Sequence, residues 1–158
     1  MKKKILYIDM DNVLVDFQSG IDQLSEKTKI IYKGHFDDVP GIFKLMKPMP
    51  RAIEAFKSLS EKFETYILST APWNNSTAWS DKLEWVKKYL GEMANRRLIL
   101  SHYKNLLCGD FIVDDRDKRG VKEFMGEHIH FATKKFPDWN KVVDYLINRH
   151  QDLNKQSK

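Results

Sequence analysis

The feature that most constrains this chain is an apolar run that ends in two carboxylates. Residues Ile5 to Ile8 are apolar enough for one buried parallel strand, and Asp9 and Asp11 stand where that strand should end. Because an unpaired charge inside a protein is costly, the strand has to stop there, open into a crevice or meet a cation. An Asp-x-Asp pair alone is equally compatible with a strand that ends in an ordinary acidic turn.

A second acidic pair favours the crevice. Phe111 to Val113 repeats the apolar pattern, and Asp114 and Asp115 follow it. In an open α/β sheet, ligand sites form outside the carboxyl ends of the strands. Two such ends side by side would gather several carboxylates around one point. That arrangement needs a cation, and a set of ligands that are all oxygen atoms favours Mg²⁺.

These motifs resemble those of a known enzyme superfamily. Asp9-Met10-Asp11 resembles the nucleophile motif of the haloacid dehalogenase-like phosphatases, and the Leu68 to Pro72 turn, Lys104 and Asp114-Asp115-Arg116 follow in the order of that superfamily. Within it, the chain looks most like the 5′(3′)-deoxyribonucleotidases. The resemblance runs over most of residues 4 to 132.

The pattern along the chain predicts an α/β fold, a three-layer domain around a Rossmann-like parallel sheet, because strand and helix signals alternate. Short connections and right-handed crossovers restrict the strand order. The order 3-2-1-4-5, numbered along the chain, would make Asp9, Asp11 and Asp114 converge, and the resemblance implies the same order. The expected strands are 5–8, 65–69, 97–100, 110–113 and 128–131, and the expected helices are 16–29, 42–46, 51–62, 80–90, 121–125 and 137–149.

We expect one domain over residues 1–158, long enough to bury a sizeable core. Its parts would be a core (1–15 and 47–150), a small helical cap inserted after the first strand (16–46) and a polar tail (151–158). The resemblance implies the cap. The pattern of residues 16–46 alone fits equally a helical hairpin packed on the sheet.

Composition and charge narrow the classes of partner. No apolar run approaches the ~20 residues of a membrane helix, so we expect no membrane association. The single Cys108 fits a reducing, cytoplasmic compartment, and we expect it to be buried near the start of a strand. The net charge of +5 equals the lysines at positions 2, 3, 4, 155 and 158, which we interpret as solvated tails. Nucleic acid is therefore not favoured as a partner, and a homodimer is left open.

The resemblance implies a role for each polar residue of the crevice. Asp9 would be the nucleophile that forms an aspartyl-phosphate, and Asp11 would be the general acid for the leaving alkoxide and then the base for water. Mg²⁺ would be held by Asp9, the backbone carbonyl of Asp11, and Asp114. Asp115 would ligate it through water or orient Lys104. Lys104 would neutralise the charge of the phosphate and of the carboxylates.

The resemblance also implies where the substrate binds. Thr70 and the backbone N–H of Ala71 would hold phosphate oxygens, and Phe17, Phe43 and Trp73 are the candidates for stacking on a nucleobase. Each has a simpler interpretation. Taken alone, Thr70 is also a common turn or capping residue, Lys104 a common surface lysine, and the three aromatic residues are common core residues.

Together these features predict a Mg²⁺-dependent phosphomonoesterase that hydrolyses (deoxy)ribonucleoside monophosphates to nucleoside and phosphate. The alternatives are a phosphatase of another small phosphate ester and, less favoured, a non-catalytic nucleic-acid-associated domain. Two positions depart from the family pattern. Asn12 stands where glycine is frequent, which is tolerable because asparagine accepts unusual turn dihedrals. Ala71 stands where relatives often carry a hydroxyl, so the preferences for base, sugar and phosphate position stay open.

Overall fold

The computed structural model of the protein describes residues 3–156. Its centre is a five-stranded parallel sheet in the order β5-β4-β1-β6-β7, which is the predicted order 3-2-1-4-5. The prediction of an α/β fold around a parallel sheet is therefore confirmed. The strands are β1 (Ile5–Ile8), β4 (Glu64–Ser69), β5 (Leu98–Leu100), β6 (Phe111–Asp114) and β7 (Glu127–His130).

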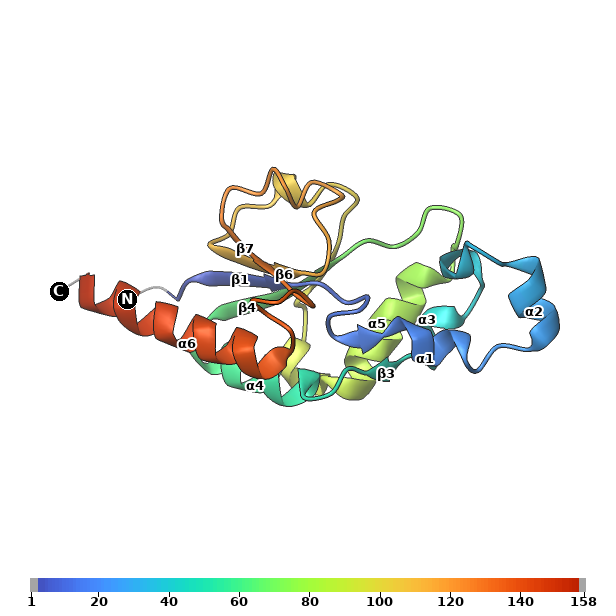
Figure 1. Cartoon of the computed structure of the whole chain (residues 1–158), viewed down its shortest axis with the longest axis horizontal. Helices are drawn as coiled ribbons and strands as arrows, with labels where there is room; N and C mark the ends of the chain where they lie inside the picture. The colour runs from blue at the N-terminus through green and yellow to red at the C-terminus, as the bar shows by residue number, and fades with distance from the viewer. Residues whose placement is uncertain (1–2, 157–158) are drawn as a thin grey trace.

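A second, two-stranded ladder joins the ends of the segment that follows β1. Strands β2 (Val15–Asp16) and β3 (Lys47–Pro48) pair antiparallel. The segment between them holds α1 (Phe17–Ile21), α2 (Glu26–Ile31), η1 (Phe36–Asp38) and α3 (Ile42–Leu45). Figure 1 shows these helices beyond the carboxyl ends of the sheet strands, at the opposite end of the molecule from the start of β1.

The prediction of a single helix over residues 16–29 is wrong, because two short helices form there. Asp16 caps α1 by accepting a hydrogen bond from the Ser19 N–H, and Ser25 caps α2 by accepting one from the Thr28 N–H. Serine is strongly preferred at a helix N-cap because its hydroxyl satisfies a backbone donor that has no partner inside the helix. Ser25 therefore starts a new helix where the apolar spacing alone indicated a continuous one.

The two faces of the sheet are covered differently. Helices α4 (Ala52–Lys62) and α6 (Trp139–Gln156) pack against each other on one face, as Figure 1 shows. On the other side of the sheet, Val121 and Phe124 complete a smaller hydrophobic cluster with side chains of β1, β4 and β6. The segment before them contains η3 (Lys104–Leu106). Helix α5 (Ala78–Tyr89) and η2 (Gly91–Ala94) connect β4 to β5.

The helix predicted over residues 121–125 is absent, because this stretch forms turns. Five residues make too few intrahelical hydrogen bonds to offset the cost of nucleating a helix. The preceding Gly120 has a φ of +83°, which turns the chain sharply at this point. Phe124 packs edge-on against Tyr7 from β1, with 6.0 Å between the ring centroids. Packing on the sheet, rather than helical hydrogen bonding, therefore decides the conformation here.

The closing helix is longer than predicted. We predicted a helix over 137–149 followed by a polar tail from 151, whereas α6 starts at Trp139 and continues to Gln156. The Asp138 side chain accepts a hydrogen bond from the Lys141 N–H at 3.1 Å and so caps the start of the helix. Leu153 packs against the core in the extension. Residues 157 and 158 of the predicted tail lie outside the described residues.

Cys108 is exposed, so the prediction that it is buried is wrong. It lies in the irregular stretch before β6, where the Tyr7 hydroxyl donates a hydrogen bond to its backbone carbonyl at 2.8 Å. That contact fixes the backbone and leaves the thiol outside the packed core.

Within residues 3–156, no helix is long and apolar enough to cross a bilayer. Lys4 is exposed and pairs with Asp110 at 2.9 Å, as a solvated lysine near a chain end can. Lys2 and Lys158, two of the other terminal lysines, lie outside the described residues.

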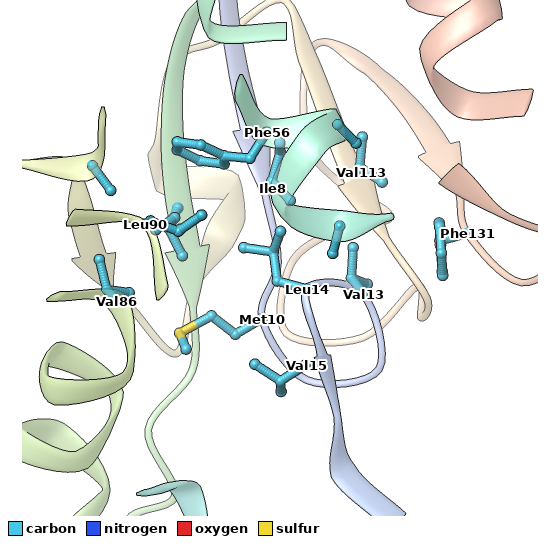
Figure 2. Packing of buried hydrophobic residues seen from close by; sticks show 14 of the residues in the cluster. Ile8, Met10, Val13, Leu14, Val15, Phe56, Val86, Leu90, Val113 and Phe131 are labelled. Carbon is cyan, nitrogen blue, oxygen red and sulfur yellow. The ribbon is translucent and has the colours of Figure 1, made fainter. Parts of the chain in front are cut away.

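The hydrophobic core continues past β1 into the turn that carries the expected nucleophile. Figure 2 shows Met10, Val13, Leu14 and Val15 packed together with Ile8. The N–H groups of Val13, Leu14 and Val15 all donate to the Met10 carbonyl, at distances of 3.1, 2.9 and 2.9 Å. Burial and hydrogen bonding therefore fix the backbone that presents the two neighbouring aspartates.

Candidate active site

The first aspartate pair sits on a rigid turn at the end of β1. The Asp9 N–H donates to the Val113 carbonyl at 2.9 Å, which extends the pairing of β1 with β6 by one residue. Asn12 has a φ of +59°, in the left-handed region that asparagine tolerates better than most residues. Its N–H donates to the Val15 carbonyl at 2.8 Å. The prediction that asparagine is tolerated in this turn is confirmed.

The carboxylates of two neighbouring strands meet at one buried lysine. Lys104 places its Nζ 2.9 Å from Asp9 Oδ1 and 2.5 Å from Asp114 Oδ2, and all three side chains are buried. The lysine comes from η3, and its backbone N–H donates to the Arg119 carbonyl at 2.8 Å. The strand order thus brings together Asp9, Asp114 and Lys104, which are far apart in the sequence.

A group of oxygen atoms beside this lysine fits a small divalent cation. Asp9, Asp114 and Asp115 each offer a carboxylate oxygen, and these atoms all lie within 4.8 Å of one another. Within the described part of the chain, Asp115 Oδ1 is buried without a hydrogen-bond partner, and Arg116 Nε lies 3.7 Å away. A buried carboxylate oxygen without a hydrogen bond is costly unless a cation meets it. The donor set of oxygen atoms alone matches the ligand preference of Mg²⁺.

The Asp11 carboxylate lies outside this group and has a lysine of its own. Lys82, from α5, places Nζ 2.8 Å from Asp11 Oδ1 and 2.9 Å from Oδ2. The lysine is fully buried, and it also donates to the Ser69 hydroxyl at 3.1 Å. Its Nζ lies 4.2 Å from the centroid of the Phe43 ring, within range of a cation–π contact. Lys82 therefore fixes the Asp11 side chain in place.

Burial dominates the electrostatics of the site. Burial raises the pKa of Asp11 above its usual range, although Lys82 opposes the rise. Burial also raises the pKa of Asp114 to about 7, with the Asp9 charge adding to it. Burial alone would lower the pKa of Lys104, but the carboxylates of Asp9 and Asp114 raise it above its ordinary value. The two carboxylates thus favour the charged form of Lys104, and the raised pKa of Asp11 suits a group that gives and takes a proton.

A pocket of about 360 Å³ opens beside these groups. Asp11, Phe17 and Thr70 line it, together with Phe36 of η1. The Thr70 hydroxyl donates a hydrogen bond to the Ser101 carbonyl at 2.8 Å. This hydroxyl has to leave that partner before it can donate to a phosphate oxygen.

The remaining predicted substrate residues are not all in the pocket. Phe43 is buried and contacts Phe17 edge-on, with 6.0 Å between the centroids, so it supports the pocket wall from within the core. The Ala71 side chain is fully buried. Trp73 is 82% exposed and lines a separate hollow. The structure therefore brings Phe17 to the pocket and separates Trp73 from it.

Comparisons with known proteins identify the family. A family model described as "5' nucleotidase, deoxy (Pyrimidine), cytosolic type C protein" matches residues 19–151. A protein of Vibrio phage KVP40 named putative 5′(3′)-deoxyribonucleotidase is 59% identical over 149 residues, covering 94% of this chain and 88% of the phage protein. The chain belongs to the 5′(3′)-deoxyribonucleotidase family.

More distant relatives agree with this family and with the fold. The human "5'(3')-deoxyribonucleotidase, cytosolic type" is 26% identical, covering 79% of this chain and 78% of the human protein. A haloacid dehalogenase-like hydrolase from Xanthomonas campestris superimposes with a TM-score of 0.59 at 7% identity, over 98% of this chain and 99% of that one. The resemblance to the deoxyribonucleotidase family is confirmed, and the fold is similar to that of a haloacid dehalogenase-like hydrolase. As a member of the family, the chain is a phosphoric monoester hydrolase.

Lys82 belongs to the site of this deoxyribonucleotidase family member, but the sequence did not lead us to predict it. A lysine in an amphipathic helix ordinarily belongs to its solvated face. A signal was nevertheless present, because Ala78, Trp85 and Val86 lie four before, three after and four after Lys82, and all are buried. A lysine in the middle of an apolar helix face indicates a buried cation that needs a carboxylate partner.

Proposed function

We propose that the protein hydrolyses (deoxy)ribonucleoside monophosphates to nucleoside and phosphate, and that the reaction depends on Mg²⁺. The observation that carries this proposal is the meeting of Asp9, Asp114 and Lys104 beside a pocket lined by Asp11 and Phe17. The names of the phage and human relatives support the class of substrate. The human relative's cytosolic type also supports a cytoplasmic location.

The residues at the ends of β1 and β6 would hold the metal. Asp9, Asp114 and Asp115 supply the carboxylate oxygens, and we assign the backbone carbonyl of Asp11 to the same ligand set. Bound there, Mg²⁺ would withdraw negative charge from the phosphoryl group as the nucleophile approaches.

The two aspartates of the turn would divide the chemistry. A carboxylate oxygen of Asp9 attacks phosphorus, and the bond from phosphorus to the nucleoside oxygen breaks. Asp11 gives its proton to the departing alkoxide, which leaves as the nucleoside. Asp11 then takes a proton from the water that hydrolyses the aspartyl-phosphate. Lys82 holds Asp11 during both steps, and Lys104 stays charged beside Asp9.

Substrate binding would combine the phosphate turn with the aromatic wall. Thr70 and the Ala71 N–H would hold phosphate oxygens, and Phe17 would stack on the base because it lines the pocket. Phe43 would act through Phe17, since it is buried behind that ring.

A panel of phosphate esters, assayed with Mg²⁺ and after complete chelation, tests the proposal. We expect turnover of nucleoside monophosphates with Mg²⁺ and its loss on chelation. Full activity after chelation would contradict the metal role. Preference for esters that are not nucleotides would favour the alternative, a phosphatase of another small ester.

Two substitutions test the roles of the aspartates. Asp9→Asn should abolish turnover, whereas Asp11→Asn should still become phosphorylated by a substrate with a good leaving group. Asp22→Asn is the matched control, because Asp22 is an exposed aspartate at the end of α1. Peptide mapping of the trapped phosphoprotein should find phosphate on Asp9, and phosphate on any other residue would overturn the assignment.

A further inference from the structure

Three aromatic side chains gather on one part of the surface. Among the described residues, the exposed large aromatic side chains are Trp73, Trp79 and Tyr103. Trp73 and Trp79 both pack against the His102 ring, with centroid distances of 6.0 and 6.2 Å. Tyr103 follows His102 in the chain and is 65% exposed. Exposed aromatic residues scattered singly need no explanation, but a cluster of them marks a binding surface.

This cluster borders a second hollow of about 470 Å³. The residues that line it are Trp73, His102, Tyr103, Arg119 and Gly120. We call it the outer hollow. It combines flat apolar rings with one guanidinium group, which is the chemistry that binds a nucleobase next to a phosphate.

The outer hollow adjoins the pocket of the proposed active site. Arg119 lines both. Trp73 follows the phosphate turn at Thr70, and Tyr103 directly precedes Lys104, so the walls of the outer hollow continue from the two segments that build the site. A ligand that fills the pocket beside Asp11 can therefore extend past Arg119 into the outer hollow.

The backbone that carries Arg119 is held firmly. The Arg119 carbonyl accepts the Lys104 N–H at 2.8 Å, and Arg119 has a φ of +57°. A Cβ on Gly120 would lie 2.2 Å from Asn105 Oδ1, so the turn packs too tightly for a side chain there. The Arg119 side chain is exposed and forms no ion pair within the part of the chain that the structure describes. Its charge is therefore available to a ligand at a defined place.

We propose that the outer hollow binds the second nucleoside of a phosphate-terminated oligonucleotide. The first nucleoside would occupy the pocket beside Phe17, Arg119 would bind the phosphodiester between the two nucleosides, and Trp73 and Tyr103 would stack on the second base. This inference rests on the proposed function, because the reaction is still hydrolysis of the terminal phosphomonoester. The substrate class thus includes the ends of short single strands as well as mononucleotides.

The test compares mononucleotides with dinucleotides that carry the same terminal phosphate. One pair is thymidine 3′-monophosphate and 3′-phosphorylated dithymidylate, and the other carries the phosphate at the 5′ end. For at least one pair, we expect kcat/KM of the dinucleotide to exceed that of the mononucleotide by about fivefold or more, the gain from one stacked base. Tyr103→Ala should remove most of this gain and leave mononucleotide turnover within about twofold.

Two further variants and one physical measurement sharpen the test. Arg119→Gln should weaken the salt dependence of dinucleotide turnover, because it removes the cation assigned to the phosphodiester. Met125→Ala is the matched control, since Met125 is 92% exposed and lies outside the residues that line the outer hollow. It should change neither substrate. Sedimentation of wild type and Tyr103→Ala measures whether the aromatic cluster instead joins two copies of the chain.

The outcomes separate this inference from the proposed function. If no mononucleotide is hydrolysed, the proposed function fails. If mononucleotides are hydrolysed but neither dinucleotide is preferred, or if Tyr103→Ala lowers both substrates equally, the outer hollow is not a nucleoside site. A dimer that Tyr103→Ala dissociates, without any preference for dinucleotides, assigns the cluster to self-association and overturns the inference.

Discussion

The buried pair formed by Lys82 and Asp11 allows a quantitative prediction of how substitutions change the stability of the protein. Lys82 is fully buried, and its partners are the Asp11 carboxylate, the Ser69 hydroxyl and the Phe43 ring. Removing Asp11 alone leaves a buried ammonium with one neutral hydrogen bond and one ring. We therefore expect the single variant Asp11→Ala to be less stable than the double variant Asp11→Ala/Lys82→Met, which removes the buried ammonium as well.

The distances set the scale of the effect. At 2.8 Å, two unit charges attract by about 6 kcal/mol at an effective dielectric constant of about 20, before the cost of burying them is subtracted. Removing one partner of a buried pair typically costs about 3–5 kcal/mol, which we expect for Asp11→Ala. Lys82→Met should cost less, because Asp11 stays 15% exposed and can take up a proton. The double variant should be more stable than Asp11→Ala by about 1 kcal/mol or more.

Urea unfolding of wild type, the two single variants and the double variant, followed by far-ultraviolet circular dichroism, measures this coupling. Lys87→Met is the matched control, because Lys87 is exposed on the same helix and should change stability by less than about 0.5 kcal/mol. If the effects of the two single variants add to within about 0.5 kcal/mol, the pair is not coupled and the assignment of Lys82 as the positioning cation for Asp11 is refuted.

Four further predictions follow from the geometry of the site and its surroundings. Phe17→Ala should lower kcat/KM for a nucleoside monophosphate by at least about fivefold and barely change turnover of a small aryl phosphate. The buried Phe43→Ala should instead cost about 3–5 kcal/mol of stability in urea. Burial raises the pKa of Asp114 to about 7, so the folded, metal-free protein keeps a proton that the unfolded chain releases. Its melting temperature should therefore fall as the pH rises from about 4 to about 8, Asp114→Asn should flatten that slope, and Mg²⁺ should raise the melting temperature most at the high-pH end. Gly120→Ala should destabilise the protein by more than about 1 kcal/mol in the same urea assay, because its Cβ would meet Asn105 and φ is positive.

The sheet could be predicted from the sequence because its three central strands are largely buried and apolar. Four of the five strands carry apolar runs that a parallel sheet requires, and connection rules then leave few orders. Local conformations outside the sheet were harder. At Ser25 a capping hydroxyl overrides the apolar spacing, and at Phe124 contact with Tyr7 overrides a weak helix signal. Both decisions depend on neighbours that a pattern along the chain does not reveal.

The convergence of Asp9, Asp114 and Lys104 shows how far the site itself could be predicted. The strand order makes the two aspartates neighbours, whereas Lys104 was expected only from the family resemblance. Lys82 was missed because its partner, Asp11, is distant in sequence and its helix otherwise has an ordinary charged face. Residue type alone could not separate the three aromatic candidates. Phe17 lines the pocket, Phe43 is buried behind it, and Trp73 lies outside it.

The net charge of the site explains why it contains two buried lysines. Asp9, Asp11, Asp114 and Asp115 carry four negative charges when ionised, and Lys82 and Lys104 return two positive ones. The difference of two is the charge that one divalent cation neutralises. A phosphate monoester then adds about two negative charges, and the cationic side chains that line the pocket, Arg116 and Arg119, are both exposed. The net charge of these aspartates and lysines therefore balances that of the metal, and the exposed arginines remain available to bind the substrate. Loss of either lysine would leave an excess negative charge at the point where another anion must arrive.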